Sequence, residues 1–279
     1  MKHISRFSVW FIGSCLSMSA MAAEPLRTAV DGTFAPHAMP SLGGGVQGFN
    51  VDLGRAIAKQ MGRDITIDSA EFSGLMPGLN ARKYDFIVAP VTVTPERANN
   101  LLFTEGYLDS DYTFVQKKGA EPITALEQLN GTTLAVNKGS NYEGWAKQNA
   151  ATYGFKYDVY SSNADAIQAL LSGRASANLS GTTVAGWAAK QNPQLQTSYT
   201  IKSGQFWAIA FRKDDMAGRD AANLALKCLK QNGTIVGLAE KWFGFTPDAD
   251  SAAAKVQHGF GVAGLPGYED KDVALECRA

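Results

Sequence analysis

The chain has 279 residues, with 26 Lys and Arg against 26 Asp and Glu, and 45% of its residues are hydrophobic. That apolar share excludes a disordered chain, and the zero net charge argues against nucleic acid as a partner, since phosphate binding needs a basic excess. The length lies near the size at which a single hydrophobic core divides, so we expect two lobes.

The first residues have the pattern of a secretory signal. Lys2 and Arg6 precede a short apolar run, and small residues lead to Ala20-Met21-Ala22, so we predict a signal peptide over 1–22 and a periplasmic protein. The run is shorter than the roughly 20 apolar residues that a membrane-spanning helix needs. Removal of residues 1–22 leaves 24 Lys and Arg against 26 Asp and Glu. A less favoured alternative is lipoprotein processing that anchors the chain at Cys15.

Strand and helix patterns then alternate along the chain, which predicts an α/β fold with largely parallel sheets. The hydrophobic spacing and the turn residues predict the following elements. The strands are 26–30, 65–67, 85–89, 112–116, 132–136, 157–160, 175–179 and 206–211, and the helices are 51–61, 75–81, 95–101, 141–151, 163–172, 217–231 and 234–243. Helix 75–81 is expected to carry Pro77 in its first turn, where proline is tolerated.

The last part of the chain, from about residue 247, is rich in Ala, then in Gly and Pro. We predict that it wraps over the surface of the body rather than forming further elements. If the signal is removed, Cys228 and Cys277 are the cysteines that remain, and an oxidising compartment favours a disulfide between them. A buried thiol at Cys228 with a free Cys277 is the alternative.

One strand end combines a helix start with a cation. Thr94 and Pro95 have the pattern of an N-cap followed by proline at the first helical position, which places Arg97 in the first turn. A cation is unfavourable beside the helix N-terminus unless an anion is bound there, and arginine grips a carboxylate with two parallel hydrogen bonds. A salt bridge from Arg97 to Glu96, Glu105 or another acid is equally compatible with the spacing.

Three other strand ends carry weaker signals. Asp31 and Phe34 follow the first strand, where a carboxylate could accept a hydrogen bond and an aromatic ring could stack on a ligand. Ser140 and Asn141 follow the strand at 132–136, and Gly181 and Thr182 follow the strand at 175–179. Ligands of parallel sheets collect at such positions, although plain helix capping or packing explains each residue as well.

Catalytic and metal motifs are missing from the sequence. It contains no G-x-S-x-G, H-E-x-x-H, C-x-x-C or phosphate-binding loop. Gly43-Gly44-Gly45 has the composition of a flexible turn. We therefore expect no cofactor, no metal and no catalytic residue.

Eight segments in order resemble the family 3 periplasmic solute-binding proteins, which are the amino-acid receptors of ABC importers. They cover roughly residues 25–245. They are D-G-T-F-A-P from 31, G-F-N-V-D-L from 48, F-S-G-L-M-P-G-L from 72, T-V-T-P-E-R from 92, L-E-Q-L-N-G from 126, K-G-S from 138, A-I-Q-A-L-L-S-G-R from 166, and N-G-T from 232 continuing to K-W-F-G at 241–244.

The resemblance implies a two-lobed periplasmic-binding-protein fold of type II, with two parallel-rich sheets and flanking helices joined by two crossing strands. Lobe 1 would comprise 25–115 and 206–246, lobe 2 would comprise 118–203, and 247–279 would be a C-terminal tail packed on the body. The ligand would bind between the lobes, which would close on it by a hinge motion.

The resemblance also implies roles for individual residues. Arg97 would bind the carboxylate of the ligand, with Thr92 and the Pro90 carbonyl beside it. Phe34 and Phe72 would sandwich the ligand, and Ser140 and Asn141 would close over it from lobe 2.

One position departs from the family pattern. Gly181 stands where the family usually has an acid that holds the α-ammonium group of the ligand, and the loss of that acid would cost several kcal/mol if nothing replaced it. Either Asp31, Glu143 or Glu71 substitutes, or the ligand is a carboxylate without an α-amino group. Two further differences are His37, where the family often has Phe, and Trp207, near a usual Tyr.

Three functions fit these observations. The leading one is the periplasmic substrate-binding component of an ABC importer for a small carboxylate-bearing solute, acting as a monomer with an inner-membrane permease. The second is a periplasmic enzyme similar to cyclohexadienyl dehydratase, for which Glu143 would be the candidate acid. The third is a periplasmic sensor or accessory protein that uses the same fold.

Overall fold

The computed structural model describes residues 24–278. The predicted signal peptide at 1–22 and Cys15 lie outside the described residues. Within the described part of the chain, no helix is long and apolar enough to cross a membrane.

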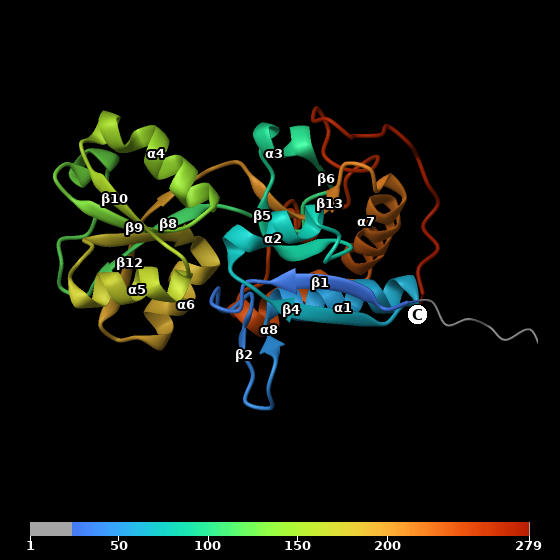
Figure 1. The fold of residues 1–279 in the computed structure, drawn as a ribbon, viewed down its shortest axis with the longest axis horizontal. Coiled ribbons are helices and arrows are strands. Elements are labelled where there is room, and N and C mark those ends of the chain that lie inside the picture. Colours follow the sequence, from blue (N-terminus) through green and yellow to red (C-terminus); the bar gives the residue numbers. More distant parts are fainter. Residues whose placement is uncertain (1–23, 279) are drawn as a thin grey trace, which may run out of the picture.

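The molecule has two lobes, which lie side by side in Figure 1. Lobe 1 contains two neighbouring sheets. In one, β1 (Leu26–Val30) pairs in parallel with β4 (Ile65–Ser69), and in the other, β13 (Phe206–Arg212) lies antiparallel between β5 (Ile87–Thr92) and β6 (Leu101–Phe103). The short β7 (Leu108–Asp109) also pairs with β13. Thr28 joins β1 to β5, because its hydroxyl donates to Phe86 O (2.8 Å) and accepts from Val88 N (3.1 Å).

Helices and one hairpin complete lobe 1. The helices are α1 (Phe49–Met61), α2 (Phe72–Asn80), α3 (Pro95–Asn100), α7 (Met216–Gln231) and α8 (Thr234–Phe243), and the hairpin joins β2 (Met39–Pro40) to β3 (Val46–Gln47). The hairpin projects from the lower side of the molecule in Figure 1. Its turn contains Gly44 and Gly45, both with positive φ, so the glycine-rich segment is a turn as predicted.

Lobe 2 is built on a five-stranded sheet in the order β10-β9-β11-β8-β12. Its elements are β8 (Tyr112–Lys117), the short helix η1 (Leu126–Leu129), β9 (Thr133–Asn137), α4 (Asn141–Tyr153), β10 (Lys156–Tyr160), α5 (Asn163–Ser172), β11 (Ala177–Gly181), α6 (Thr182–Gln191) and β12 (Leu195–Ile201). β9, β10 and β11 are parallel, whereas β8 and β12 are antiparallel to their neighbours.

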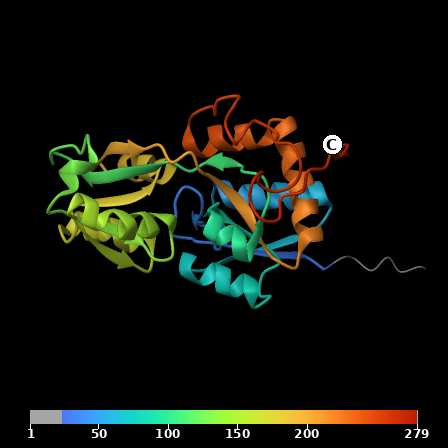
Figure 2. The same ribbon diagram turned by 90° about the horizontal axis from the view of Figure 1, so that it is seen from above.

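Two chain segments cross between the lobes, one before β8 and one after β12, as Figure 2 shows from above. They are bonded to each other, with Ser110 N donating to Gln205 O (2.9 Å) and the Ser203 hydroxyl donating to Ser110 O (2.7 Å). A segment that leaves one lobe and a segment that returns run in opposite directions, which is why β8 and β12, next to the crossings, are antiparallel and the sheet of lobe 2 is mixed. Residues 112–115, assigned to lobe 1 in the sequence analysis, pair in β8 with the sheet of lobe 2.

The predicted elements are confirmed along most of the chain, and β1, α5 and α8 have the predicted bounds. Clear termini explain the bounds of the two helices, since Ser162 caps α5 at Asp165 N (3.0 Å), and Gly173 and Gly244 end α5 and α8 in the left-handed conformation. The position of Pro77 was wrong: α2 begins at Phe72, which puts the proline inside the helix. The elements β2, β3, β6, β7, α6 and β12 were not predicted.

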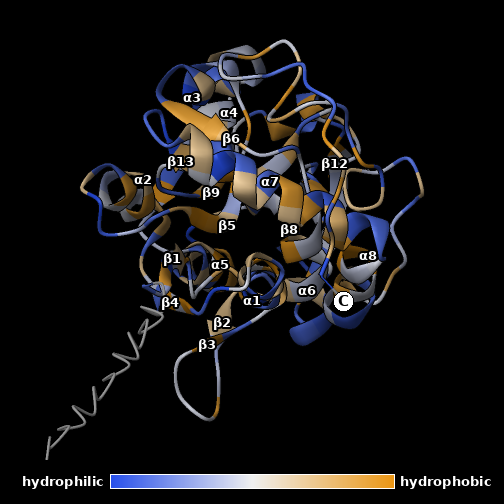
Figure 3. Cartoon of the chain, turned by 90° about the vertical axis from the view of Figure 1, so that its right-hand side faces the viewer, coloured by the Kyte–Doolittle hydropathy of each residue, from blue (hydrophilic) through white to orange (hydrophobic). Residues whose placement is uncertain are grey.

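Buried strands form the core of each lobe. All six residues of β5 are buried, and β5 and β6 are coloured as hydrophobic in the interior of Figure 3. Continuous apolar strands are expected where helices or loops cover both faces of a sheet. Among the fully buried side chains is Trp207 of β13, which lies next to the crossing segments.

Residues 246–278 form a strap that runs over lobe 1, drawn in red beside α7 in Figure 1. Ala253 and Phe260 of the strap are buried. The buried carboxylate of Glu105 accepts hydrogen bonds from Lys227 Nζ (2.5 Å) and Lys230 Nζ (2.6 Å), and these two lysines also donate to strap carbonyls at Gln257 and Lys255. The strap is thereby joined to α7 by buried charges.

The disulfide between Cys228 and Cys277 is confirmed. Cys228 is buried in α7, and Cys277 lies near the end of the strap, 49 residues later, with a Cα–Cα distance of 5.5 Å. This distance is ordinary for a disulfide. The bridge fastens the last part of the strap to the body.

Candidate ligand-binding cleft

Arg97 lies at the interface between the two lobes, which we call the seam. Thr94 accepts a hydrogen bond from Arg97 N (3.2 Å) and Pro95 follows it, so α3 starts as the sequence predicts. The guanidinium then turns back toward the strand end, where Nη1 donates to Thr92 O (2.8 Å), and across the seam, where Nη2 donates to Gly139 O of lobe 2 (3.0 Å).

The Arg97 guanidinium has no acidic partner in the described part of the chain. The ion pairs found among residues 24–278 do not include it, so the alternative of a salt bridge to Glu96, Glu105 or another acid is wrong. Its protein partners are two carbonyl oxygens and the ring of Phe72, whose centroid lies 5.8 Å from the guanidinium carbon. Burial lowers the pKa of Arg97, yet arginine remains a cation at neutral pH.

A cavity of about 1020 Å³ opens beside Arg97. It is lined from lobe 1 by the start of α3, from lobe 2 by the start of α4, and by the crossing segments. Three cations, Arg97, Lys147 and Lys202, line it together with two acids, Glu96 and Glu143, so positive charge is in slight excess there.

Ser140 and Asn141 form the lobe 2 side of this cavity. The Ser140 hydroxyl caps α4 by accepting from Glu143 N (3.2 Å) and donates to Asn137 O (2.6 Å). Asn141 Nδ2 donates to Gln205 Oε1 (2.8 Å) and to the hydroxyl of Tyr112, both near the crossing segments. Burial raises the pKa of Tyr112 to about 12, so this phenol stays neutral.

Asp31 lies at another point of the seam. Its carboxylate is buried, and Oδ1 accepts from Thr33 N (2.9 Å) and Thr33 Oγ1 (2.7 Å), while Oδ2 accepts from Asn137 Nδ2 of lobe 2 (3.4 Å). Thr33 Oγ1 also accepts from Asn163 N of lobe 2 (3.2 Å). All these donors are neutral.

His37 joins the lobes at the buried side of the seam. Asn50 uses its amide nitrogen to donate to Val88 O (2.5 Å) and to Tyr107 Oη (2.6 Å), so its Oδ1 is the acceptor for His37 Nδ1 (2.8 Å). The neutral ring therefore carries its proton on Nδ1 and accepts at Nε2 from the hydroxyl of Thr183 in lobe 2 (2.7 Å). Burial lowers the pKa of His37 to about 4.

Trp207 and Tyr142 occupy the space next to Gly181. A Cβ atom at Gly181 would lie 2.8 Å from two carbons of the Trp207 indole and 2.8 Å from the Tyr142 hydroxyl. The indole is fixed there because Trp207 Nε1 donates to Thr92 Oγ1 (3.2 Å). Burial raises the pKa of Tyr142, so its hydroxyl is neutral. The position therefore excludes any larger side chain, an acid included.

The remaining predicted residues lie on or near the same seam. Phe34 is stacked against Tyr142 with ring centroids 6.5 Å apart, whereas Phe72 faces Arg97, so the two rings have different partners. Pro90 is buried in β5. Thr182 begins α6 and bonds Thr113 through their hydroxyls (2.9 Å). That these residues bind a ligand stays a prediction.

Sequence reasoning missed the residues of lobe 2 that meet lobe 1 directly. These are Asn137, Tyr142, Asn163 and Thr183. Each stands within a few residues of a predicted strand end or helix start, but nothing in the local pattern distinguishes a side chain that crosses the seam from one that caps a helix.

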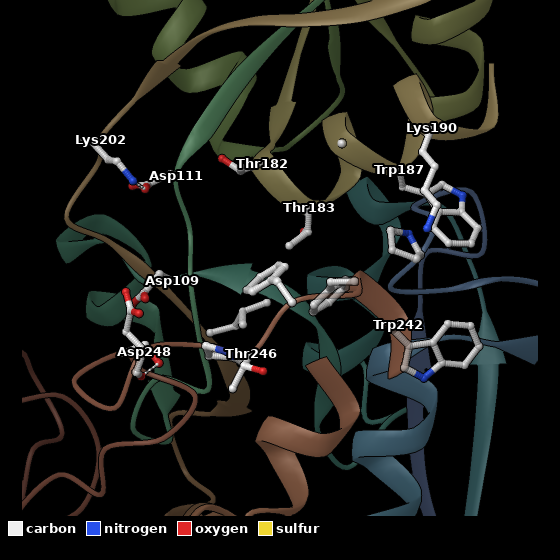
Figure 4. A pocket seen from close by; sticks show the side chains of 17 residues that line it. Asp109, Asp111, Thr182, Thr183, Trp187, Lys190, Lys202, Trp242, Thr246 and Asp248 are labelled. Carbon is white, nitrogen blue, oxygen red and sulfur yellow. Dashed lines mark hydrogen bonds and ion pairs between the residues drawn. The ribbon is translucent and has the colours of Figure 1, made fainter. Parts of the chain in front are cut away.

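A second cavity, of about 590 Å³, lies between α6 and the end of α8 (Figure 4). Trp187 and Trp242 line it from the two lobes, and residues 246–248 of the strap contribute to its wall. Thr183, which bonds His37, also lines this cavity.

Residues 24–278 contain no group of three or more His, Cys, Asp or Glu side chains that could hold a metal ion. Glu143, the acid considered for a dehydratase, accepts a hydrogen bond from Gly139 N (2.6 Å) at Oε2.

Known proteins match this chain over most of its length. The arginine-binding extracellular protein ArtP of Bacillus subtilis is 31% identical over 241 residues, which are 85% of this chain and 93% of that protein. An ancestral arginine-binding protein bound to arginine matches with a TM-score of 0.75 and 34% identity, covering 79% of this chain and 98% of its own. The ancestral amino acid-binding protein AncCDT-1, a precursor of cyclohexadienyl dehydratase, matches with a TM-score of 0.72 and 30% identity over 78% and 95% of the two chains.

A sequence profile of the bacterial extracellular solute-binding proteins, family 3, matches residues 26–245. This range contains the sheets of both lobes, both crossing segments and the interface with Arg97. The fold is the two-lobed type II fold of periplasmic amino-acid-binding proteins. By sequence and by fold, the chain belongs to family 3 of the bacterial extracellular solute-binding proteins.

Proposed function

We propose that this protein is the periplasmic binding component of an ABC importer and that it holds a small carboxylate-bearing solute at Arg97, between the lobes. The family is one of extracellular solute-binding proteins, and relatives are named as arginine-binding proteins of ABC transporters. The signal pattern at 1–22 supports export to the periplasm, where the protein acts as a monomer with an inner-membrane permease.

The observation that carries the carboxylate is Arg97, a partly buried cation without an acidic partner among the described residues. Two carbonyl oxygens occupy only part of the five N–H donors of its guanidinium, and taking a cation out of water without a counter-charge is costly. A carboxylate placed against the remaining donors would supply the missing charge and a bidentate hydrogen bond. Closure of the lobes would follow, because Arg97 already bonds lobe 2 at Gly139 O.

The test is a thermal-shift panel of small carboxylates with L-arginine among them, run on the wild type and on Arg97→Gln. At least one carboxylate should raise the melting temperature of the wild type, and none should raise that of the variant. Glu127, exposed on η1 and away from this cavity, supplies the control variant Glu127→Gln, which should respond as the wild type does. A shift that Arg97→Gln retains in full, or a wild type that no carboxylate shifts, would contradict the proposal.

A further inference from the structure

We infer that the cavity of about 590 Å³ between α6 and α8 is the surface on which the membrane permease docks. We call it the docking cavity. Its occupant is a periplasmic segment of the permease that carries a basic residue next to apolar side chains. The inference rests on the proposed function, because it takes the protein as the binding component of an importer. Three observations carry it: an aromatic wall, two acids that have no ion pair among the described residues, and walls that come from both lobes and from the strap.

Aromatic side chains that are only partly buried line one end of the docking cavity. Trp187 of α6 and Trp242 of α8 lie there (Figure 4), and Phe243 and Phe245 follow Trp242 along the chain. Trp187, Trp242 and Phe243 are half-buried, and Phe245 is 48% exposed. Aromatic rings grouped in an accessible hollow are typical of protein interfaces, where they carry much of the binding energy. This end therefore suits apolar side chains of a partner.

The aromatic wall on the lobe 1 side is fixed by contacts within the protein. Trp242 Nε1 donates to Asp52 Oδ2 (2.9 Å). The ring of Phe243 stacks on those of Phe49 and Phe245, with centroids 4.9 Å and 5.9 Å away. Side chains that are already ordered lose little conformational freedom on binding, so a partner gains more net affinity from contact with them.

The other end of the docking cavity is acidic. Asp109 and Asp248 line it, and the ion pairs found among residues 24–278 include neither of them. Asp111 is already paired with Lys202 (2.8 Å), and Lys190 lies with the tryptophans at the aromatic end in Figure 4. A basic residue of the partner would meet two carboxylates here, whereas an acidic residue would be repelled.

The docking cavity depends on the relative position of the lobes. Its walls come from α6 of lobe 2 and from α8 of lobe 1, and Asp111 and Lys202, which lie in the two crossing segments, complete it. Lys202 also lines the cavity beside Arg97. Both cavities therefore border the same crossing segments, and a hinge motion that opened the seam would change the width of the docking cavity as well. A partner that fits it as it stands distinguishes the closed form from an open one.

The strap adds a part of the wall that the family profile does not cover. Thr246, Pro247, Asp248 and Ser251 line the docking cavity, whereas the profile ends at residue 245. The buried lysines bonded to Glu105 and the disulfide fix the strap to lobe 1, so these residues are held at the cavity. A fixed wall outside the shared part of the fold allows a permease to distinguish this receptor from its relatives.

The experiment is site-specific photocrosslinking of the full chain in cells of its own bacterium. One strain carries Phe245→p-benzoylphenylalanine and a second carries Trp187→p-benzoylphenylalanine, and peptide mass spectrometry identifies what each probe has joined. Both probes should capture the same inner-membrane protein, a permease subunit of an ABC importer, at a periplasmic segment that contains a basic residue. Val159 of β10, an apolar side chain that is 40% exposed, is the control position and should give at least tenfold less of this product.

A charge reversal tests the acidic end. In the strain with the probe at Phe245, Asp248→Lys should lower the yield of the permease crosslink at least tenfold, because it places a cation against the basic residue of the partner. Asp158→Lys, which makes the same change at an exposed position of β10, is the matched control and should leave the yield unchanged. Both variants should keep the rise in melting temperature that a carboxylate gives the wild type, since neither residue lines the cavity beside Arg97.

Three outcomes overturn the inference: a permease captured at Phe245 but not at Trp187, capture of only a soluble protein or a second copy of this chain, and a crosslink yield that Asp248→Lys leaves unchanged. A wild type that a carboxylate stabilises, while neither probe captures a permease, would reject the docking cavity and keep the proposed solute site. A permease captured by both probes, in a protein that no carboxylate stabilises, would keep the docking cavity and reject the solute site.

Discussion

His37 is a buried base that meets both lobes. It bonds Asn50 of lobe 1 and Thr183 of lobe 2, and the rings of Phe49, Trp207 and Phe243 surround it. No charged side chain contributes to the shift in its pKa, which is due to burial and opposed in part by the bond to Asn50. The ring must therefore be neutral for the native packing.

This gives a pH dependence of stability. The unfolded chain takes up the proton of His37 near its ordinary pKa of 6.5, whereas the folded protein takes it up only at about 4. Between these values the unfolded state binds more protons, so the free energy of unfolding falls as the pH falls, by about 3 kcal/mol in total. Urea titrations between pH 7 and pH 4 measure it.

His37→Gln should remove this part of the pH dependence, since it removes the titrating ring. His258→Gln, at a half-exposed position on the strap, should retain it. Equal slopes of stability against pH for the wild type and His37→Gln would show that His37 is not the cause.

A second prediction at the scale of single residues concerns Gly181. Gly181→Ala should lower the free energy of unfolding by about 1–3 kcal/mol, because its Cβ would press on Trp207 and Tyr142 at 2.8 Å. Gly186→Ala, five residues on in α6 with nothing within 4 Å, should raise it by roughly 0.5–1 kcal/mol. Denaturant titration of both variants checks the contrast, and equal effects would mean that the space beside Gly181 is open.

At the scale of elements, the strap depends on a buried group of charges. Glu105 accepts from Lys227 and Lys230, which in turn hold the strap backbone. A second group anchors it further on, where Arg219 donates to Gly267 O (2.7 Å) and to Glu269 Oε2 (3.1 Å). Both arginine and lysines come from α7, so this helix is the one on which the strap is fixed.

Glu105→Gln should therefore cost about 3–5 kcal/mol, because it leaves two buried lysines without a carboxylate. The matched surface change, Asp214→Asn, removes an exposed carboxylate that pairs with Arg82 and with Arg212, and it should cost less than about 1 kcal/mol. Denaturant titration measures the free energy of unfolding of both variants, and proteolysis of the strap measures how firmly the strap is held. A Glu105→Gln variant as stable as Asp214→Asn would mean that the strap is held by its apolar contacts alone.

The elements that could be predicted are those with strong local signals. Helix α5 has a serine cap, an apolar face and a glycine end, and its bounds follow from these. Helix α6 starts at Gly181 without a side-chain cap and carries Gly186, and β12 is mostly half-buried with a mixed pattern. What places both is the sheet of lobe 2, in which β12 pairs with β8 and α6 packs against β8 and β12, and a local pattern does not contain these contacts.

At the scale of the whole molecule, the lobes are in contact. His37 bonds Thr183, Arg97 bonds Gly139 and Asp31 bonds Asn137, in each case from lobe 1 to lobe 2. The strand ends that carry Arg97 and Asp31 could be predicted, because strand-to-helix junctions have sequence signatures. Their partners across the seam could not, because those contacts depend on how two separate sheets meet.

A crosslink tests this closed arrangement. A Cβ atom at Gly139 lies 3.5 Å from Ser73 Cβ, which is within the range of a disulfide. On oxidation, the double variant Ser73→Cys/Gly139→Cys should therefore form a disulfide between the lobes, and the oxidised protein should no longer exchange solute. The φ of +73° at Gly139 adds about 1–2 kcal/mol of strain to a cysteine at that position. Peptide mapping by mass spectrometry detects the bridge.

The control pairs Ser73→Cys with Gly186→Cys, whose position has no neighbour within 4 Å, and it should stay unbridged. A Ser73/Gly139 pair that fails to oxidise would show that the lobes do not meet in this way in solution. A ligand that favours closure should speed up the crosslinking.

The disulfide also sets an order of events during biogenesis. If the chain is exported as proposed, Cys228 leaves the export channel 49 residues before Cys277, so its thiol must wait for its partner. Removal of the predicted signal, which contains Cys15, would leave two cysteines, and these allow one pairing only. A periplasmic thiol oxidase would then be sufficient to complete the protein, and a disulfide isomerase would have nothing to correct.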